Sequence, residues 1–282
     1  MLGIIGGSGL YQLEGLKIDT ERTLITPFGA ASAAISCGEY GGQQVLFLAR
    51  HGREHQLLPH EINYRANIYA LKALGARRII SFSAAGSLRQ ELKPGDLALV
   101  EQYFDHTRGR REQSFFSLGV AAHVSTANPV CAALNSDIER AAAAVDQPLH
   151  IHNTYACVEG PRLGTRAESF FLRDAVNCDL VGMTNLPEAF LAREAQIAYS
   201  SLCLITDYDC WMDDPSQHVS VEKFFEVYSD TLASAIKVLK PLVASPFTET
   251  PHHIRQALKS AVLTPRQQLS SEQQQWLEVL ER

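Results

Sequence analysis

The sequence lacks several features that would place it in a broad class at once. It has no apolar run long enough to span a bilayer, which argues against a transmembrane protein. Its first residues show neither the basic region nor the cleavage site of a secretory signal peptide. The six cysteines are scattered without a CxxC pair, a distribution typical of reduced, buried thiols and not of a disulfide framework. We therefore expect a cytoplasmic protein.

A strong excess of charge is missing as well. The net charge of −6 over 282 residues argues against nonspecific nucleic-acid binding, although local basic groups could still hold a small anion. With 46% hydrophobic and 20% charged residues, the composition is that of a globular protein with a sizeable core. The length suits one large α/β domain or two small ones.

Two familiar nucleotide-binding motifs are also absent. In the Gly-rich stretch after the first apolar strand, the sixth position of a GxGxxG motif counted from Gly7 is Gln12, and no GKS or GKT of a Walker loop follows. The glycines and the Ser8 hydroxyl could still approach an anion closely. A tight turn with no ligand is the alternative interpretation.

What the sequence does contain is a repeated order of strand, then polar or small residues, then helix. Arg50 and His51 directly follow a predicted strand at 45–49. A predicted strand at 78–83 ends in the small residues 83–86. This order is typical of an α/β protein, in which ligands bind beyond the carboxyl ends of the strands. Helices are predicted from Pro59 to Leu74, near 130–145, from a Thr165 capping box, from Pro187, from a Ser220 cap to about 242, and after a cap at 264–267.

The residues after strand 45–49 allow two kinds of site. Arg50 is suited to bidentate contact with phosphate, and His51 could donate a hydrogen bond to it. His51 and His55 have the spacing of a metal pair on a helix, but Gly52 lies between them and no third ligand is near. We expect no metal. A surface cluster of charges remains an alternative to the phosphate site.

The strand at 201–206 ends in two acids, Asp207 and Asp209. Residues two apart share one side of a strand, so both carboxylates can face the same space. Together with Trp211 they could hold a flat base that carries hydrogen-bond donors. The alternative is that Asp207 caps a turn and Asp209 is solvated.

Ten segments of the chain, taken in order, resemble the trimeric purine nucleoside phosphorylases, and most closely their 5′-methylthioadenosine phosphorylase branch. They are GGSGL at 6–10, TPFG at 26–29, LARHGR at 48–53, NYRAN at 63–67, AGSL at 85–88, PGD at 94–96, EGPR at 159–162, RAES at 166–169, MT at 183–184 with PE at 187–188, and TDYDCW at 206–211. The resemblance covers roughly residues 1–242.

The resemblance implies an α/β fold with a central mixed, twisted sheet flanked by helices. It implies one phosphorylase domain over 1–245, a helical tail over 246–282 that could contact a neighbouring subunit, and a homotrimer. It also implies phosphorolysis of a nucleoside with inorganic phosphate as co-substrate and with no cofactor, metal, nucleic acid or membrane. The implied site residues are Asp207 and Asp209 for catalysis at the purine; Ser8, Arg50, His51, Ser83, Ala84 and Thr184 for phosphate; and Met183, Leu163, His55, His123, Phe224 and Phe225 for the nucleoside.

Three functions follow from these residues as alternatives. The first is phosphorolysis of 5′-methylthioadenosine, with Asp207 as the general acid for purine N7 and His123 reaching a neighbour's 5′ pocket. The second is a 6-oxopurine nucleoside phosphorylase. Branches of that kind carry Asn within the segment matching 206–209 and Glu at the position of Gly164, so this sequence favours adenine. The third is a nucleoside-binding protein without catalysis, against which the acid pair argues.

Overall fold

Runs of consecutive apolar residues form the inner strands of the sheet, which are buried on both faces. The computed structural model describes residues 1–7, 15–117, 119–214 and 221–282. In β1 (Leu2–Gly6), Ile4 belongs to one hydrophobic core and Ile5 to another. In β4 (Gln43–Ala49), Phe47 and Leu48 divide in the same way. Because successive strand residues point to opposite faces, the sheet separates two cores.

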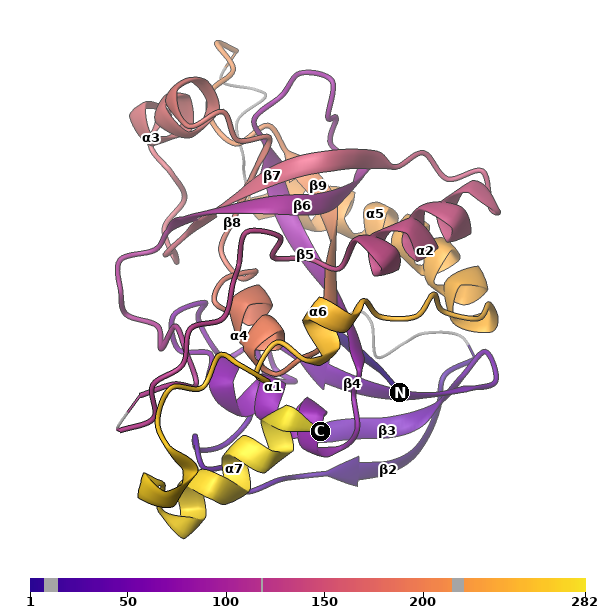
Figure 1. Ribbon diagram of the computed structural model, residues 1–282. Helices are drawn as coiled ribbons and strands as arrows, with labels where there is room; N and C mark the ends of the chain where they lie inside the picture. The colour runs from indigo at the N-terminus through magenta and orange to yellow at the C-terminus, as the bar shows by residue number, and fades with distance from the viewer. Residues whose placement is uncertain (8–14, 118, 215–220) are drawn as a thin grey trace.

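The strands of the described residues form one nine-stranded mixed sheet in the order β2-β3-β4-β1-β5-β8-β7-β6-β9. β5 also pairs with β9, so the second half of the sheet closes on itself (Figure 1). The predicted α/β fold with a central mixed sheet is confirmed. The remaining strands are β2 (Lys17–Arg22), β3 (Ile35–Tyr40), β5 (Arg78–Ser87), β6 (Leu97–His106), β7 (His150–Val158), β8 (Leu180–Gly182) and β9 (Ala198–Asp207).

Helices cover both faces of the sheet. On one side, α1 (Tyr64–Ala73) packs against α4 (Glu188–Glu194) and α7 (Ser271–Glu281). On the other side, α2 (Ala132–Ala143) packs against α5 (Val221–Ala244), and both contact β9. The short α3 (Arg166–Phe170) continues into a π-helical turn at Phe171–Ala175, and Figure 1 shows it at the top of the molecule. The tail also holds α6 (His252–Arg255) and a 3₁₀ turn at Arg266–Gln268.

Polar side chains set the helix starts, and two predicted starts are wrong. The helix expected from Pro59 begins at Tyr64, because the Asn63 side chain accepts a hydrogen bond from the Ala66 amide and caps the first turn. The cap expected at 264–267 forms only the 3₁₀ turn, and α7 is capped instead by Ser270. The Thr165 capping box is confirmed, whereas the predicted Ser220 cap lies outside the described residues.

The sheet topology brings several strand ends to one edge. β4, β1, β5 and β9 pair in parallel, with Gly6 beside Ala49 and Ser83 beside Cys203. The carboxyl ends of parallel strands meet at the same edge. The residues after β1 and β4, the end of β5 and the end of β9 therefore lie around one space.

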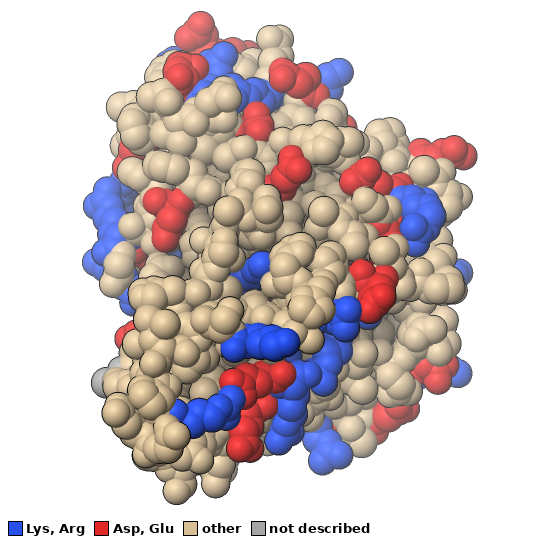
Figure 2. All heavy atoms as spheres, viewed as in Figure 1, with Lys and Arg blue, Asp and Glu red and all other residues tan. Residues whose placement is uncertain are grey.

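The outer surface carries charges of both signs. On the face shown in Figure 2, Lys and Arg side chains are intermixed with Asp and Glu side chains. No helix in the described part of the chain has both the length and the apolar character needed to cross a bilayer.

Candidate active site

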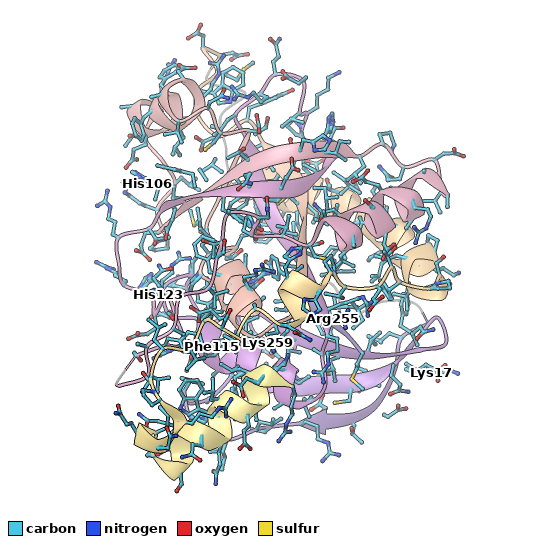
Figure 3. All side chains as sticks on the ribbon, viewed as in Figure 1. Lys17, His106, Phe115, His123, Arg255 and Lys259 are labelled. Carbon is cyan, nitrogen blue, oxygen red and sulfur yellow. The ribbon has the colours of Figure 1, made fainter. Side chains whose placement is uncertain are left out.

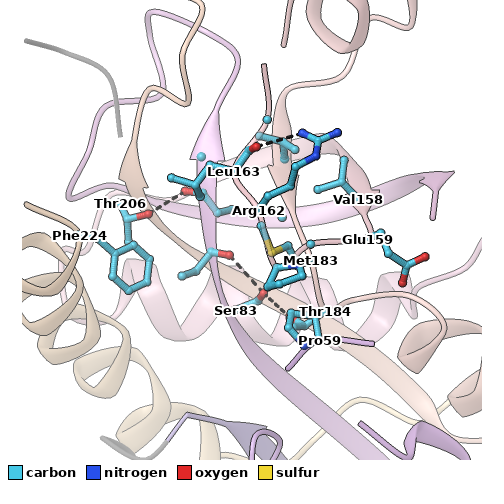
Figure 4. A pocket seen from close by; sticks show the side chains of 18 of the residues that line it. Pro59, Ser83, Val158, Glu159, Arg162, Leu163, Met183, Thr184, Thr206 and Phe224 are labelled. Atoms are coloured by element: carbon cyan, nitrogen blue, oxygen red, sulfur yellow. Dashed lines mark hydrogen bonds between the residues drawn. The ribbon is translucent and has the colours of Figure 1, made fainter. Parts of the chain in front are cut away.

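A cavity of about 820 Å³ lies at this common edge of the strands (Figure 4). It is lined by twelve of the fourteen site residues that the resemblance implies: Arg50, His51, His55, Ser83, Ala84, Leu163, Met183, Thr184, Asp207, Asp209, Phe224 and Phe225. They come from β5, β9, α5 and the segments that follow β4, β7, β8 and β9. Strand order, and not closeness in sequence, brings them together.

Arg50 lies at the cavity wall with its side chain almost fully buried. Its Nε and Nη2 atoms donate to the two Glu188 carboxylate oxygens at 2.7 and 2.9 Å, and further donors reach Ser81 Oγ and the Phe82 carbonyl oxygen. The bidentate side of the guanidinium therefore faces Glu188 and not the cavity, which differs from the bidentate phosphate contact expected from sequence. A guanidinium has five N–H donors, and described residues accept four of them, which leaves one for a ligand. Burial opposes the charge, but Glu188 raises the pKa of Arg50 above its usual value.

The tautomer of His51 is set by a backbone group. Its Nδ1 atom lies 2.8 Å from the Leu57 carbonyl oxygen, which can only accept, so Nδ1 carries the proton. Burial lowers the pKa of His51 to about 4. At neutral pH its Nε2 atom is therefore a hydrogen-bond acceptor. The His55 ring stacks on the His51 ring at a centroid distance of 4.5 Å.

Ser83 and Thr184 contribute two hydroxyl groups to the cavity wall. Ser83 Oγ, at the level of Cys203 in the β5–β9 pairing, lies 3.0 Å from Thr184 Oγ1, as the dashed line in Figure 4 shows. Both side chains are buried. With the N–H of Ala84 and the free donor of Arg50, these hydroxyls can surround a tetrahedral anion.

The two acids lie in a buried part of the same cavity. Asp207 accepts hydrogen bonds from Thr206 Oγ1 at 2.7 Å and from the Asp209 amide at 2.8 Å. Burial raises the pKa of both carboxyl groups above the usual value. A Cβ atom on Gly164 would lie 3.9 Å from both Asp209 carboxylate oxygens, so Asp209 faces the segment after β7. A buried acid with a raised pKa can act as a proton donor near neutral pH.

Another part of the wall is apolar and aromatic. Met183, Leu163 and Phe225 line it, and the Phe224 ring stacks on Tyr228 at 5.8 Å with an interplanar angle of 11°. The Tyr228 hydroxyl lies 3.0 Å from the position of a Cβ on Gly7. Tyr228 was not predicted from sequence, although its position one helical turn after Phe224 is a signal that could have identified it.

Two described residues that were predicted from sequence, Trp211 and His123, do not line the cavity. Trp211 is buried elsewhere: its Nε1 atom donates to the Ser87 carbonyl oxygen at 2.7 Å and the Arg173 guanidinium stacks over its ring, so the expectation that it holds the base is wrong. His123 lies beside the C-terminal segment, where its amide donates to the Ala261 carbonyl oxygen (Figure 3). Ser8 lies outside the described residues.

A family model for the phosphorylase superfamily matches residues 1–240. The chain belongs to this superfamily. The phosphorylase is 42% identical to the S-methyl-5′-thioadenosine phosphorylase of Geobacter sulfurreducens over 99% of this chain and 97% of that protein. It is 48% identical to the enzyme of that name from Synechocystis, covering 94% of this chain and 81% of that protein. The predicted resemblance to nucleoside phosphorylases is thereby confirmed.

Solved structures of similar proteins agree with the fold. A methylthioadenosine phosphorylase from an Antarctic soil metagenomic library superposes with a TM-score of 0.92 at 43% identity, covering 99% of this chain and 98% of that one. The methylthioadenosine phosphorylase of Schistosoma mansoni in complex with adenine gives a TM-score of 0.85 at 33% identity, covering 93% of this chain and 98% of that one. Both likenesses extend beyond residue 240 into the tail.

One buried arginine that supports the phosphorylase site was not found from sequence. Arg111, in the loop after β6, pairs with Glu159 at 3.0 Å and donates to the Met183 and Leu186 carbonyl oxygens at 2.6 Å. It therefore ties the segments that carry Glu159 and Met183 to this loop. The only signal in the sequence was an arginine cluster in a long loop.

Proposed function

We propose that this phosphorylase cleaves S-methyl-5′-thioadenosine with inorganic phosphate, giving adenine and 5-methylthioribose 1-phosphate. The observation that carries the proposal is that one cavity contains an anion site of buried donors and, with it, two buried carboxyl groups of raised pKa. Phosphorylases of this name that share more than two fifths of the sequence over nearly the whole chain support it. Such a reaction serves purine and methionine salvage.

The phosphate end supplies binding and orientation. The free N–H of Arg50 and the hydroxyls of Ser83 and Thr184 donate to phosphate oxygens. His51 Nε2 accepts from the hydroxyl of hydrogen phosphate, which turns a charged oxygen towards the sugar. As the glycosidic bond breaks, the sugar gains positive charge, and an anion held beside C1′ stabilises it and then captures it.

The purine end supplies the proton. Asp207 donates to N7, so that adenine leaves as a neutral base, and its buried environment keeps the carboxyl group protonated to higher pH. Asp209 accepts from the purine and supports Asp207, whose Oδ1 atom accepts the Asp209 amide hydrogen. Met183 contacts the ribose. Leu163, His55, Phe224 and Phe225 surround the 5′-methylthio group.

We also propose a cytoplasmic homotrimer, in which His123 reaches a neighbour's cavity and the tail over 246–282 contacts a neighbour. His123 lies away from the cavity of its own chain, which supports a role in another one. All six cysteines are free thiols, as suits a reducing compartment. Sedimentation of the purified protein should give a mass near three times 31.1 kDa.

Product analysis tests the proposed reaction. The purified protein is incubated with methylthioadenosine, methylthioinosine, adenosine and inosine, each with and without phosphate. We expect adenine and 5-methylthioribose 1-phosphate to form from methylthioadenosine only when phosphate is present. Turnover independent of phosphate would contradict phosphorolysis. Faster turnover of methylthioinosine would establish the 6-oxopurine alternative, and nucleoside binding without any turnover would establish the binding protein.

A further inference from the structure

A buried tyrosine lies behind the phosphate end of the cavity. Tyr155, in β7, is completely shielded from solvent and does not line the cavity. Its phenol reaches across the neighbouring strand β8 at Gly182, where a Cβ atom would lie only 2.0 Å from the Tyr155 hydroxyl. Any larger residue at this position would displace the phenol. Gly182 therefore leaves the space through which the hydroxyl passes.

Two residues of the phosphate site, Ser83 and Thr184, influence the pKa of Tyr155. Burial raises the pKa of Tyr155 well above its usual value, and the Ser83 hydroxyl and the Thr184 backbone act in the opposite direction as hydrogen-bonding neighbours. Yet across residues 1–7, 15–117, 119–214 and 221–282, no group forms a hydrogen bond of ordinary length and angle with it. An unsatisfied buried hydroxyl costs about 1–3 kcal/mol, so its retention needs a reason.

The Ser83 hydroxyl offers a reason to retain Tyr155. Ser83 Oγ lies 3.0 Å from Thr184 Oγ1 and makes only a long contact of 3.3 Å to the Ala84 carbonyl oxygen. A serine hydroxyl has one donor and two acceptor sites. If Ser83 accepts from Tyr155, its own hydrogen is free to turn from the backbone towards an anion in the cavity.

We propose that Tyr155 is a positioning residue for phosphate. Its hydroxyl accepts from the Thr184 backbone N–H and donates to Ser83 Oγ, which directs the Ser83 hydrogen to a phosphate oxygen. Each hydrogen bond in such a chain polarises the next one. The inference rests on the proposed function, because it requires phosphate at Ser83 and Thr184. Tyr155 itself does not touch the substrate.

The variant Tyr155→Phe removes only this hydroxyl. With methylthioadenosine saturating, we expect the KM for phosphate to rise roughly 3- to 10-fold, the equivalent of one hydrogen bond. The kcat at saturating phosphate and the KM for the nucleoside should stay within about twofold, as expected when uniform binding is lost. Phosphate should raise the melting temperature less in Tyr155→Phe than in the wild type. This measurement reports phosphate binding without turnover.

A neighbouring tyrosine gives the matched control. The Tyr103 ring packs edge-to-face on Tyr155 at 5.8 Å, and its hydroxyl lies 3.4 Å from Asn185 Nδ2 instead of beside Ser83. Tyr103→Phe should leave the KM for phosphate unchanged. In a Ser83→Ala background, adding Tyr155→Phe should cause no further increase, because the group that Tyr155 orients is gone.

The possible failures are distinguishable. If the wild-type protein turns over nucleoside without needing phosphate, the proposed function fails before Tyr155 is tested. If the wild type needs phosphate, three results would overturn the role of Tyr155. They are an unchanged KM for phosphate in Tyr155→Phe, an equal rise in Tyr103→Phe, and an undiminished effect of Tyr155→Phe in the Ser83→Ala background.

Discussion

The Asp207 carboxyl group shows how opposed influences act on a single residue. Burial raises its pKa, while hydrogen bonds from Thr206 and the Asp209 amide favour the charged form and lower it. Burial is the larger influence, so the pKa is raised overall. A proton donor needs this balance, because a fully exposed aspartate would be ionised at neutral pH.

Replacing this acid should remove most of the activity. For Asp207→Asn we expect kcat with methylthioadenosine to fall by at least about 100-fold, since general acids contribute that much or more. The kcat/KM ratio of methylthioinosine to methylthioadenosine should rise, because the amide can donate to a 6-oxo group. Steady-state kinetics with both nucleosides measures this. Asp213→Asn, at a fully exposed acid beyond the same strand, is the control. A near-wild-type kcat in Asp207→Asn would show that another group protonates N7.

Lys72 offers a second test at a single residue. Its side chain is buried, Nζ has no hydrogen-bond partner among the described residues, and burial lowers its pKa to about 7. The unfolded chain has the ordinary lysine pKa of about 10.4, so it holds more protons between pH 7 and 10. Wild-type stability from this group therefore rises with pH in that window.

Lys72→Met should stabilise the protein because it removes an unpaired buried charge. We expect a gain of roughly 1–4 kcal/mol at pH 7 that shrinks towards pH 10. Thermal unfolding at several pH values measures this difference. Lys259→Met, at an exposed lysine (Figure 3), should stay within about 0.5 kcal/mol of wild type at every pH. A gain in Lys72→Met that did not depend on pH would contradict a titrating Lys72.

At the scale of elements, close contact between strand ends holds the acids in place. β5 and β9 pair in parallel up to Gly86 and Asp207, with an irregularity at this point. A Cβ atom on Gly86 would lie 2.9 Å from Asp207 Oδ1 and 3.3 Å from Asp209 Cβ. The missing side chain at Gly86 therefore allows both acids to reach their positions.

Gly86→Ala tests this packing. We expect kcat/KM for methylthioadenosine to fall at least about tenfold, because a shift of the acids by a fraction of an ångström disturbs proton transfer. Thermal unfolding in parallel should show that the fold is retained. Full activity in a folded Gly86→Ala protein would mean that the position of Asp207 tolerates this shift.

At the scale of the whole molecule, the tail joins the core of the same chain. Trp276, Leu277 and Leu280 of α7 belong to the core that includes α1 and α4, and Trp276 packs on Phe28 at 5.7 Å. The Gln196 side chain donates to the Leu280 and Glu281 carbonyl oxygens. The tail therefore packs into the core of its own subunit.

Trp276→Ala should accordingly destabilise the whole protein. We expect a loss of roughly 3–5 kcal/mol with a single unfolding transition, because the cavity opens in the shared core. Gln275→Ala, at an exposed position of the same helix, should have little effect. Loss of α7 alone, with the main transition unchanged, would instead show that the tail is a separate unit. Chemical denaturation followed by tryptophan fluorescence and by circular dichroism distinguishes the two outcomes.

The sequence by itself determined the α/β class, the family and twelve of the residues that line the cavity. These depend on local signals: apolar strands that end in Arg50, Ser83 or Asp207, and short motifs whose order is kept. The end of a strand can be recognised in the sequence because the hydrophobic periodicity and the residue composition change there. That these ends meet in one space followed from the rule for parallel strands.

Only the tertiary structure decided which partners those residues have. Arg50 pairs with Glu188, which is 138 residues away, and Trp211 turns into a separate small core instead of the cavity. The Tyr155 phenol can cross β8, which lies between β7 and β5, only because Gly182 has no side chain at the crossing. Such contacts depend on strand order and on close approach across the sheet, and neither leaves a local pattern in the sequence.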